Sequence, residues 1–292
     1  MTWERASLGA VIADLSAEGI DLDALVSADG VDLDTDTPAA GWTVAHQIAH
    51  LHWTDALTLL SCRNPAEFAS ARERLLAASL TDRIDAAAAE GAQVPGSELL
   101  AQWRTGRAEV LMALGDVPPG TRLEWIGPPM GAGTMASARI METWAHGQDI
   151  ADALGVDRAP TDRIRHVADL GVRTRDHGFR VHGLAAPESE FRIELTAPSG
   201  AKWVWGPDDA DQAVSGPAVD FALLVTQRRH PDDLALVAVG SAAAQWLTIA
   251  QAFAGAPGPG REPLVEFSDA GSQRAISVAR DSRMTVTRTC PG

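Results

Sequence analysis

Residues 137–155 read SARIMETWAHGQDIADALG, and the rest of the chain is interpreted outward from this stretch. Its apolar residues recur at helical spacing, so the stretch predicts an amphipathic helix. Ser137 is a suitable residue to cap the start of this helix, and Gly155 suits the left-handed residue that ends one. The positions expected to pack against neighbouring elements are Ile140, Trp144, Ala151 and Leu154.

The opposite face of this predicted helix carries ionisable side chains. Glu142, His146 and Asp149 follow one another at steps of four and three, so they share one side of a helix. Glu and His four residues apart are well placed to hold one divalent metal ion, with Asp149 behind them. The alternative is a polar face that is simply solvated.

A second histidine-bearing segment favours the metal interpretation. Residues 41–60 read GWTVAHQIAHLHWTDALTLL and predict a helix that is apolar on nearly all sides, and therefore buried. His46 and His50 lie on one stripe of it with Trp53 and Leu57. A buried imidazole needs a partner, which is either a carbonyl or carboxylate group or a metal ion.

The remaining patterns divide the chain into two parts. Helical periodicity over residues 3–19, 66–89 and 97–114, together with the two segments above, predicts an antiparallel bundle. Further on, the sequence predicts strands over 191–196, 202–205 and 234–239 and helices over 161–177, 219–229 and 242–254. We therefore expect a helical domain over residues 1–157, a small α+β domain over 158–256 and a disordered tail over 257–292.

Composition excludes several classes of function. The formal net charge of −15 argues against binding to nucleic acid or to an anionic membrane surface, because both require clustered Lys and Arg. The start of the chain lacks the profile of a signal peptide, and no apolar run is long enough to span a bilayer. The two cysteines, Cys62 and Cys290, lie far apart in sequence, so we expect a cytoplasmic protein without disulfides.

Several motifs resemble the mycothiol-dependent maleylpyruvate isomerase family of actinobacteria, within the DinB-like thiol-transferase superfamily. They are Trp42-Thr43, His50-Leu51, Glu142 with His146, Gly147 and Asp149, Val214-Ser-Gly-Pro-Ala218, and an apolar helix that ends in Arg228. Residues 251–261 resemble an uncharacterised metal-binding branch of that family. The resemblance covers about residues 5–260. It implies a DinB-like four-helix bundle that binds one divalent metal ion, usually zinc, followed by an α+β domain like sterol carrier proteins.

The resemblance also implies roles for individual residues. The metal ligands it implies are His50, Glu142 and His146, whereas His46 and His52 do not occupy ligand positions. Asp149 matches a family residue near the site, where an outer carboxylate can orient a ligating imidazole. Arg228 matches an arginine at the domain junction that can bind a substrate carboxylate. The sequence departs from the family at Gln227, where isomerases more often have glycine before the arginine.

A chemistry follows from this ligand set. Three protein ligands leave a coordination position open, as in catalytic zinc sites, and zinc with two histidines and one glutamate carries a net charge of +1. A thiol such as mycothiol that enters the open position would lose its proton and attack a small electrophilic substrate as metal-bound thiolate. We therefore expect a thiol-dependent isomerase or transferase. The alternatives are a hydrolase that uses metal-bound water and a metal-binding protein without catalysis. The oligomeric state is not predictable.

Overall fold

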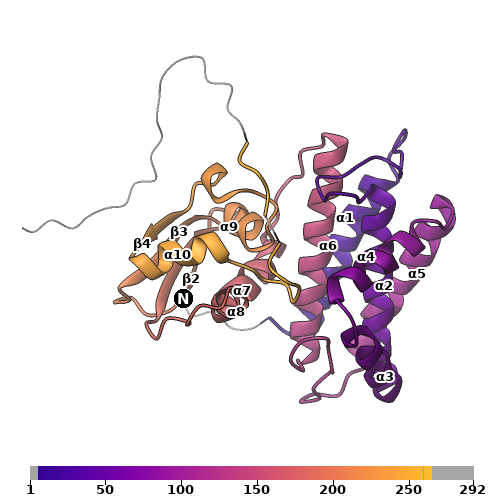
Figure 1. Ribbon diagram of the computed structural model, residues 1–292, viewed down its shortest axis with the longest axis horizontal. Helices are drawn as coiled ribbons and strands as arrows, with labels where there is room; N and C mark the ends of the chain where they lie inside the picture. Colours follow the sequence, from indigo (N-terminus) through magenta and orange to yellow (C-terminus); the bar gives the residue numbers. More distant parts are fainter. Residues whose placement is uncertain (1–5, 259, 265–292) are drawn as a thin grey trace, which may run out of the picture.

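Six helices form the first part of the chain in a computed structural model, which describes residues 6–258 and 260–264 (Figure 1). The four long ones, α1, α2, α5 and α6, pack against one another as a bundle, and α4 packs on α2. The bounds are α1 Leu8–Val26, α2 Val44–Arg63, α3 Pro65–Leu76, α4 Leu80–Gly91, α5 Gly96–Gly115 and α6 Ala132–Leu154. The predicted helical bundle is therefore present.

The ends of these helices correct several predictions. Helix α6 begins at Ala132, so Ser137 lies inside it and its hydroxyl donates to the Gly133 carbonyl rather than capping the helix. Gly155 does end α6, with a φ of 65° in the left-handed region. Gly19 does not end α1, because a single glycine costs a helix only about 1 kcal/mol when its flanks pack well. The segment predicted as one helix over 66–89 is two, α3 and α4.

The second part of the chain is a small mixed sheet covered by helices. Its four strands lie in the order β2-β1-β3-β4, in which β1 is parallel to β3 and antiparallel to β2, and β4 is antiparallel to β3. The strand bounds are β1 Phe191–Thr196, β2 Lys202–Trp205, β3 Gln212–Pro217 and β4 Val237–Val239. The helix bounds are η1 Asp162–Ile164, α7 Arg165–Arg173, α8 Arg175–Val181, α9 Ala218–Val225, η2 Pro231–Asp233 and α10 Ser241–Ile249. The expected helical domain followed by an α+β domain is confirmed.

Strand β3 was not predicted, because its sequence, QAVSGP, contains glycine and proline. Gly216 is required there by a close approach: a Cβ at this position would lie 2.6 Å from the carbonyl oxygen of Ala235. Val214 in the same strand is fully buried. The Ser-Gly-Pro motif therefore has a structural explanation in the packing of the sheet.

Helix α6 lies at the junction between the two parts (Figure 1). Glu18 of α1 is almost fully buried there and accepts hydrogen bonds from Arg158 and Arg163, at 2.6 and 2.9 Å. The predicted boundary between residues 157 and 158 stays a prediction, as α6 ends at Leu154 and the next element begins at Asp162. None of the described helices combines the length and the apolar character needed to cross a membrane.

The predicted tail lies largely outside the described residues, which end at Leu264. The described part of it, residues 257–258 and 260–264, returns to the rest of the protein. Arg261 donates to Asp149 of α6, and the Leu264 amide donates to the carboxylate of Asp233 at 3.0 Å. This part of the chain is thus held by specific hydrogen bonds, which its low-complexity composition did not indicate.

Candidate metal centre

Three ionisable side chains from two helices converge where α2 packs against α6. His50 comes from α2, and Glu142 and His146 come from successive turns of α6. One potential ligand atom from each residue lies within 4.8 Å of the other two. The two helical patterns seen in the sequence are therefore faces that meet in space, although about 90 residues separate them.

The geometry of the cluster brings nitrogen and oxygen atoms together. Glu142 Oε2 lies 3.2 Å from His146 Nε2 and 3.5 Å from His50 Nε2, and the two imidazole rings are 4.6 Å apart. His50 is buried and the His146 side chain is only 11% exposed, whereas the Glu142 side chain is 24% exposed. The carboxylate is therefore the part of the cluster that solvent or a small molecule can reach.

Gln47, which the sequence reasoning did not select, orients His146. Its side chain is fully buried, and its Oε1 contacts His146 Nδ1. The Thr37 hydroxyl donates to the Trp42 carbonyl at 2.7 Å, so it accepts from Gln47 Nε2 at 2.9 Å. Gln47 Oε1 is left to accept from His146 Nδ1, which must carry the proton. The spacing of three between Gln47 and His50 on one helix was the available signal.

This chain of hydrogen bonds leaves electron-rich atoms facing each other. A neutral His146 with its proton on Nδ1 presents a bare lone pair at Nε2 toward the Glu142 carboxylate. The buried Nδ1 of His50 has no hydrogen-bond partner among the described residues. Atoms arranged in this way require a cation or a proton between them, so the residues fit a bound metal ion.

The protonation states favour the same conclusion. Burial lowers the pKa of His146 to about 4, and the proximity of His50 and of the Arg228 guanidinium acts in the same direction, against the opposing effect of the Glu142 carboxylate. Burial alone would raise the pKa of Glu142, but the two imidazoles beside it, which can donate to its carboxylate when they are protonated, hold it well below its usual range. At neutral pH the cluster thus contains an ionised carboxylate and a neutral His146, which are the forms that bind metal.

The metal-free protein is expected to lose stability as the pH falls from about 6.5 to about 4. In this window His146 is protonated in the unfolded chain, with its ordinary pKa of 6.5, but not in the folded protein. The unfolded state then binds more protons, so acidification lowers the free energy of unfolding; Glu142 acts in the same direction. Urea denaturation with a chelator at several pH values measures this. A His146→Gln variant should show a shallower slope, and equal slopes would contradict the assignment.

Tryptophans wall the cluster on one side. The ring of Trp42 stacks on His146 with 6.0 Å between centroids and 14° between planes, and lies 5.4 Å from the His50 ring. The ring of Trp53, which the sequence placed on the same stripe of α2 as His50, lies 6.1 Å from the His50 ring. Trp144 instead packs in the apolar core shared with the second domain, as expected of a residue that faces neighbouring elements.

Asp149 has a different role from the one expected. Its carboxylate is almost fully buried and accepts from Arg228 at 2.9 Å and from Arg261 at 2.5 Å. The described residues show no hydrogen bond between Asp149 and a histidine; Gln47 occupies the position that Asp149 was expected to fill. The physical reason is that Asp149 points at the domain junction, where two guanidinium groups compensate its buried charge.

Arg228 is anchored by protein groups rather than exposed. Its guanidinium donates to Asp149 and to the Thr226 carbonyl, the latter at 2.6 Å. Its positive charge also helps to lower the pKa of His146. The preceding Gln227 has a φ of 58°, in the left-handed region that glycine occupies with less strain. Gln227, where the family more often has glycine, therefore still adopts the turn that directs Arg228 toward the domain junction.

The sequence of this chain is similar to those of known proteins. Residues 15–151, which contain the whole His50, Glu142 and His146 cluster, match the family described as mycothiol maleylpyruvate isomerase N-terminal domain. Uncharacterised proteins from two strains of Mycobacterium tuberculosis are each 53% identical over 257 residues, which is 88% of this chain and 100% of theirs. The chain belongs to the mycothiol-dependent maleylpyruvate isomerase family.

Solved structures share the fold of this family member. Two crystal structures of the mycothiol-dependent maleylpyruvate isomerase, one of them of a mutant, each align with a TM-score of 0.54. They are 15% and 16% identical and cover 80% of this chain and 93% of theirs. Residues 187–239, which contain the sheet, separately match a family described as wyosine base formation. That match includes none of the three clustered residues.

Other candidates in this family member lie away from the cluster or have other partners. His46 accepts from the Thr43 amide and helps cap α2. Burial raises the pKa of the Cys62 thiol, which argues against its use as a nucleophile; Cys290 lies outside the described residues. His166 contacts Asp14 and Ser137, at 2.9 and 3.2 Å, between the two domains.

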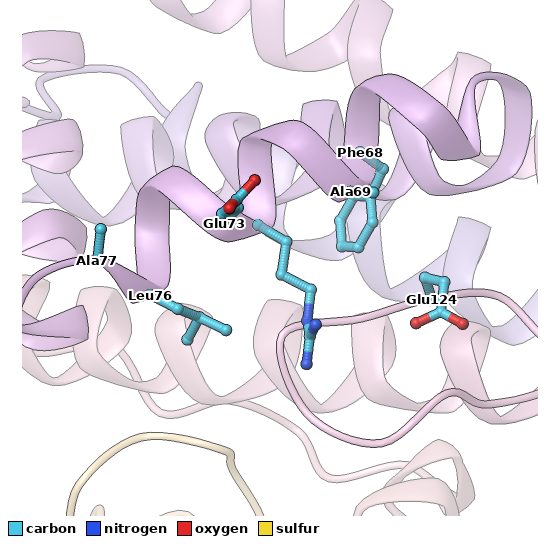
Figure 2. A pocket seen from close by; sticks show the side chains of 7 residues that line it. Phe68, Ala69, Glu73, Leu76, Ala77 and Glu124 are labelled. Atoms are coloured by element: carbon cyan, nitrogen blue, oxygen red, sulfur yellow. The ribbon is translucent and has the colours of Figure 1, made fainter.

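An open groove of about 560 Å³ lies between α3 and the loop that contains Glu124 (Figure 2). The residues that line it are Phe68, Ala69, Arg72, Glu73, Leu76, Ala77 and Glu124. Nearby, the Phe68 ring stacks on Trp125 of the same loop. None of the three clustered residues lines the groove, so it is separate from the candidate metal centre.

Proposed function

We propose that this protein is a metal-dependent, mycothiol-using isomerase or S-transferase that acts on a small electrophilic substrate. The ligands in this proposal are His50, Glu142 and His146, and zinc is the proposed metal. Membership of the mycothiol-dependent maleylpyruvate isomerase family supports the choice of thiol. The convergence of two imidazole nitrogens and a carboxylate oxygen supports the metal.

The observation that carries the proposal is the pair of contacts made by the His146 ring: Nδ1 contacts Gln47, and Nε2 lies 3.2 Å from the Glu142 carboxylate. A purely structural role would favour the tautomer with its proton between these two atoms. Gln47 and Thr37 instead hold the proton on the far nitrogen. Such support behind a ligating histidine is a regular feature of metal sites.

Each part of the chain has a function in this proposal. A divalent metal, when bound, supplies positive charge that lowers the pKa of an arriving thiol. Gln47 keeps the His146 ring in place, and the Trp42 ring shields both imidazoles from bulk water. Arg228 adds positive charge beside His146, which favours an anionic thiol or a substrate carboxylate. Glu142 marks the side from which the thiol approaches.

The direct test is to incubate zinc-loaded protein with mycothiol and a fluorescent electrophile. Formation of the thiol adduct should be faster than the uncatalysed reaction, and treatment with a chelator should remove the difference. In a Glu142→Gln variant the rate of adduct formation should fall at least about a hundredfold, because the substitution weakens a metal ligand. Loss of a group that only supports a ligand costs ~10–100-fold in activity. If the zinc-loaded protein forms no adduct, the transferase proposal fails. Hydrolysis of an ester probe instead would favour metal-activated water.

A further inference from the structure

The last described segment of the chain crosses from the second domain to the bundle. We call residues 255–258 and 260–264 the strap. It follows α10 and runs along the junction of the two domains, at the yellow end of the colour scale (Figure 1). Arg261 donates through Nη2 to Asp149 Oδ1 at 2.5 Å and through Nη1 to the Pro38 carbonyl. One guanidinium thus joins the strap to two separate parts of the bundle.

Pro38 lies in a loop that closes on itself before α2. The Val44 amide donates to the Thr35 carbonyl at 3.0 Å, and the Ala45 amide donates to the Leu33 carbonyl at 2.8 Å. This loop, residues 33–45, carries Trp42, whose ring stacks on His146. A contact that fastens Pro38 therefore also restrains the wall of the candidate metal centre.

The same loop is connected to the imidazole by hydrogen bonds. Thr37, next to Pro38, accepts from Gln47, and Gln47 contacts His146. On the other side of Arg261, Asp149 is one turn beyond His146 on α6, and its second oxygen holds Arg228. Arg261 thus completes a ring of contacts around one side of the centre.

We propose that Arg261 is a positioning residue that fastens loop 33–45, with Trp42, over the imidazole pair. The fastening itself requires no metal, and only its effect on a bound ion rests on the proposed function. Asp149 becomes partly unsatisfied when Arg261 is removed, because its carboxylate is almost fully buried and the Arg228 bond is its other side-chain hydrogen bond among the described residues. The strap thereby controls how readily small molecules and ions enter and leave the centre.

Hydrogen exchange of the metal-free full-length protein tests the fastening directly. In Arg261→Ala, exchange of the amides of loop 33–45 should accelerate at least about tenfold, because a charge-assisted hydrogen bond is lost and a buried acceptor is left partly unsatisfied. Arg261→Lys should be intermediate, since a single ammonium cannot reproduce the fork that spans two acceptors. The matched control is Arg192→Ala, which removes an arginine paired with Glu194 and Asp208 on the sheet, and it should leave the loop unchanged.

Cobalt(II) alone is the probe for the consequence at the centre. The absorption spectrum of cobalt bound to Arg261→Ala should match that of cobalt bound to the wild type, because the ligands are intact. Release of cobalt from the variant to a chelator should be about tenfold faster than from the wild type. Unchanged exchange in loop 33–45 would overturn the inference, whatever the rate of cobalt release. If cobalt binds to none of the proteins, the metal part of the proposed function fails, and the exchange measurement still decides the role of Arg261.

Discussion

Replacing His50 with alanine is expected to abolish stoichiometric binding of zinc. His50 contributes the ligand from α2, whereas Glu142 and His146 both come from α6, so its loss leaves two donors on one helix. Loss of a ligand should cost more than the ~10–100-fold in affinity that follows loss of a supporting hydrogen bond. Metal analysis of the purified proteins, followed by competition with a chelator, measures the change.

Two further variants make this result specific. His46→Ala removes a histidine one turn earlier on the same helix, where it contacts Thr43, and should keep the metal. Gln47→Ala keeps all three ligands but removes the side chain that holds the His146 ring. Its affinity for zinc should therefore lie between those of the His46→Ala and His50→Ala variants. Metal content equal to that of the wild type in a folded His50→Ala protein would refute the ligand assignment.

The largest loss of stability is expected from Asp55→Ala. Asp55 of α2 accepts from Arg139 Nε of α6 at 3.0 Å, and both side chains are almost fully buried. Removing the carboxylate leaves an unpaired guanidinium in the bundle, which costs about 3–5 kcal/mol. The free energy of unfolding from urea titration, compared with wild type in the presence of a chelator, measures this independently of metal.

The matched control removes the charge and its partner together. An Asp55→Leu/Arg139→Met double variant should be close to wild type in stability, because the unpaired charge is absent. Burial raises the pKa of Asp55 despite the neighbouring guanidinium, so desolvation outweighs part of the attraction between the pair. Glu109→Ala, which breaks an exposed pair with Arg63, should cost under about 1 kcal/mol. A comparably small loss in Asp55→Ala would contradict the prediction.

Local patterns in the sequence were sufficient to predict features that depend only on residues near one another in the chain. Helical periodicity placed Glu142 and His146 on one face, because residues four apart are neighbours on any helix. Alternation of apolar residues predicted strands β1 and β2 with the bounds that the structure has. Strand β3 was not predicted from local patterns. Glycine is needed at position 216 because the carbonyl oxygen of Ala235 lies close to it, and the residues next to Gly216 in sequence give no sign of that contact.

The partners of the polar side chains needed the tertiary structure. The sequence suggested Asp149 as the group behind a ligating imidazole, but Gln47 contacts that ring and Asp149 binds Arg228 and Arg261. Helical spacing says which residues share a face, not which face of another helix they meet. Arg261, in a segment expected to be disordered, gave no local sign of its contact with a residue 112 positions earlier.

By itself, then, the sequence determined the helical bundle, the α+β domain that follows it and the histidines and carboxylate worth considering, since these depend on periodicity and residue type. Only the tertiary structure decided that His50, Glu142 and His146 meet at one point and that Gln47 sets the tautomer of His146. It also decided that the strap reaches the Trp42 loop. The reason is that side-chain hydrogen bonds and ion pairs depend on the direction of atoms brought together by packing, which spacing along one element does not contain.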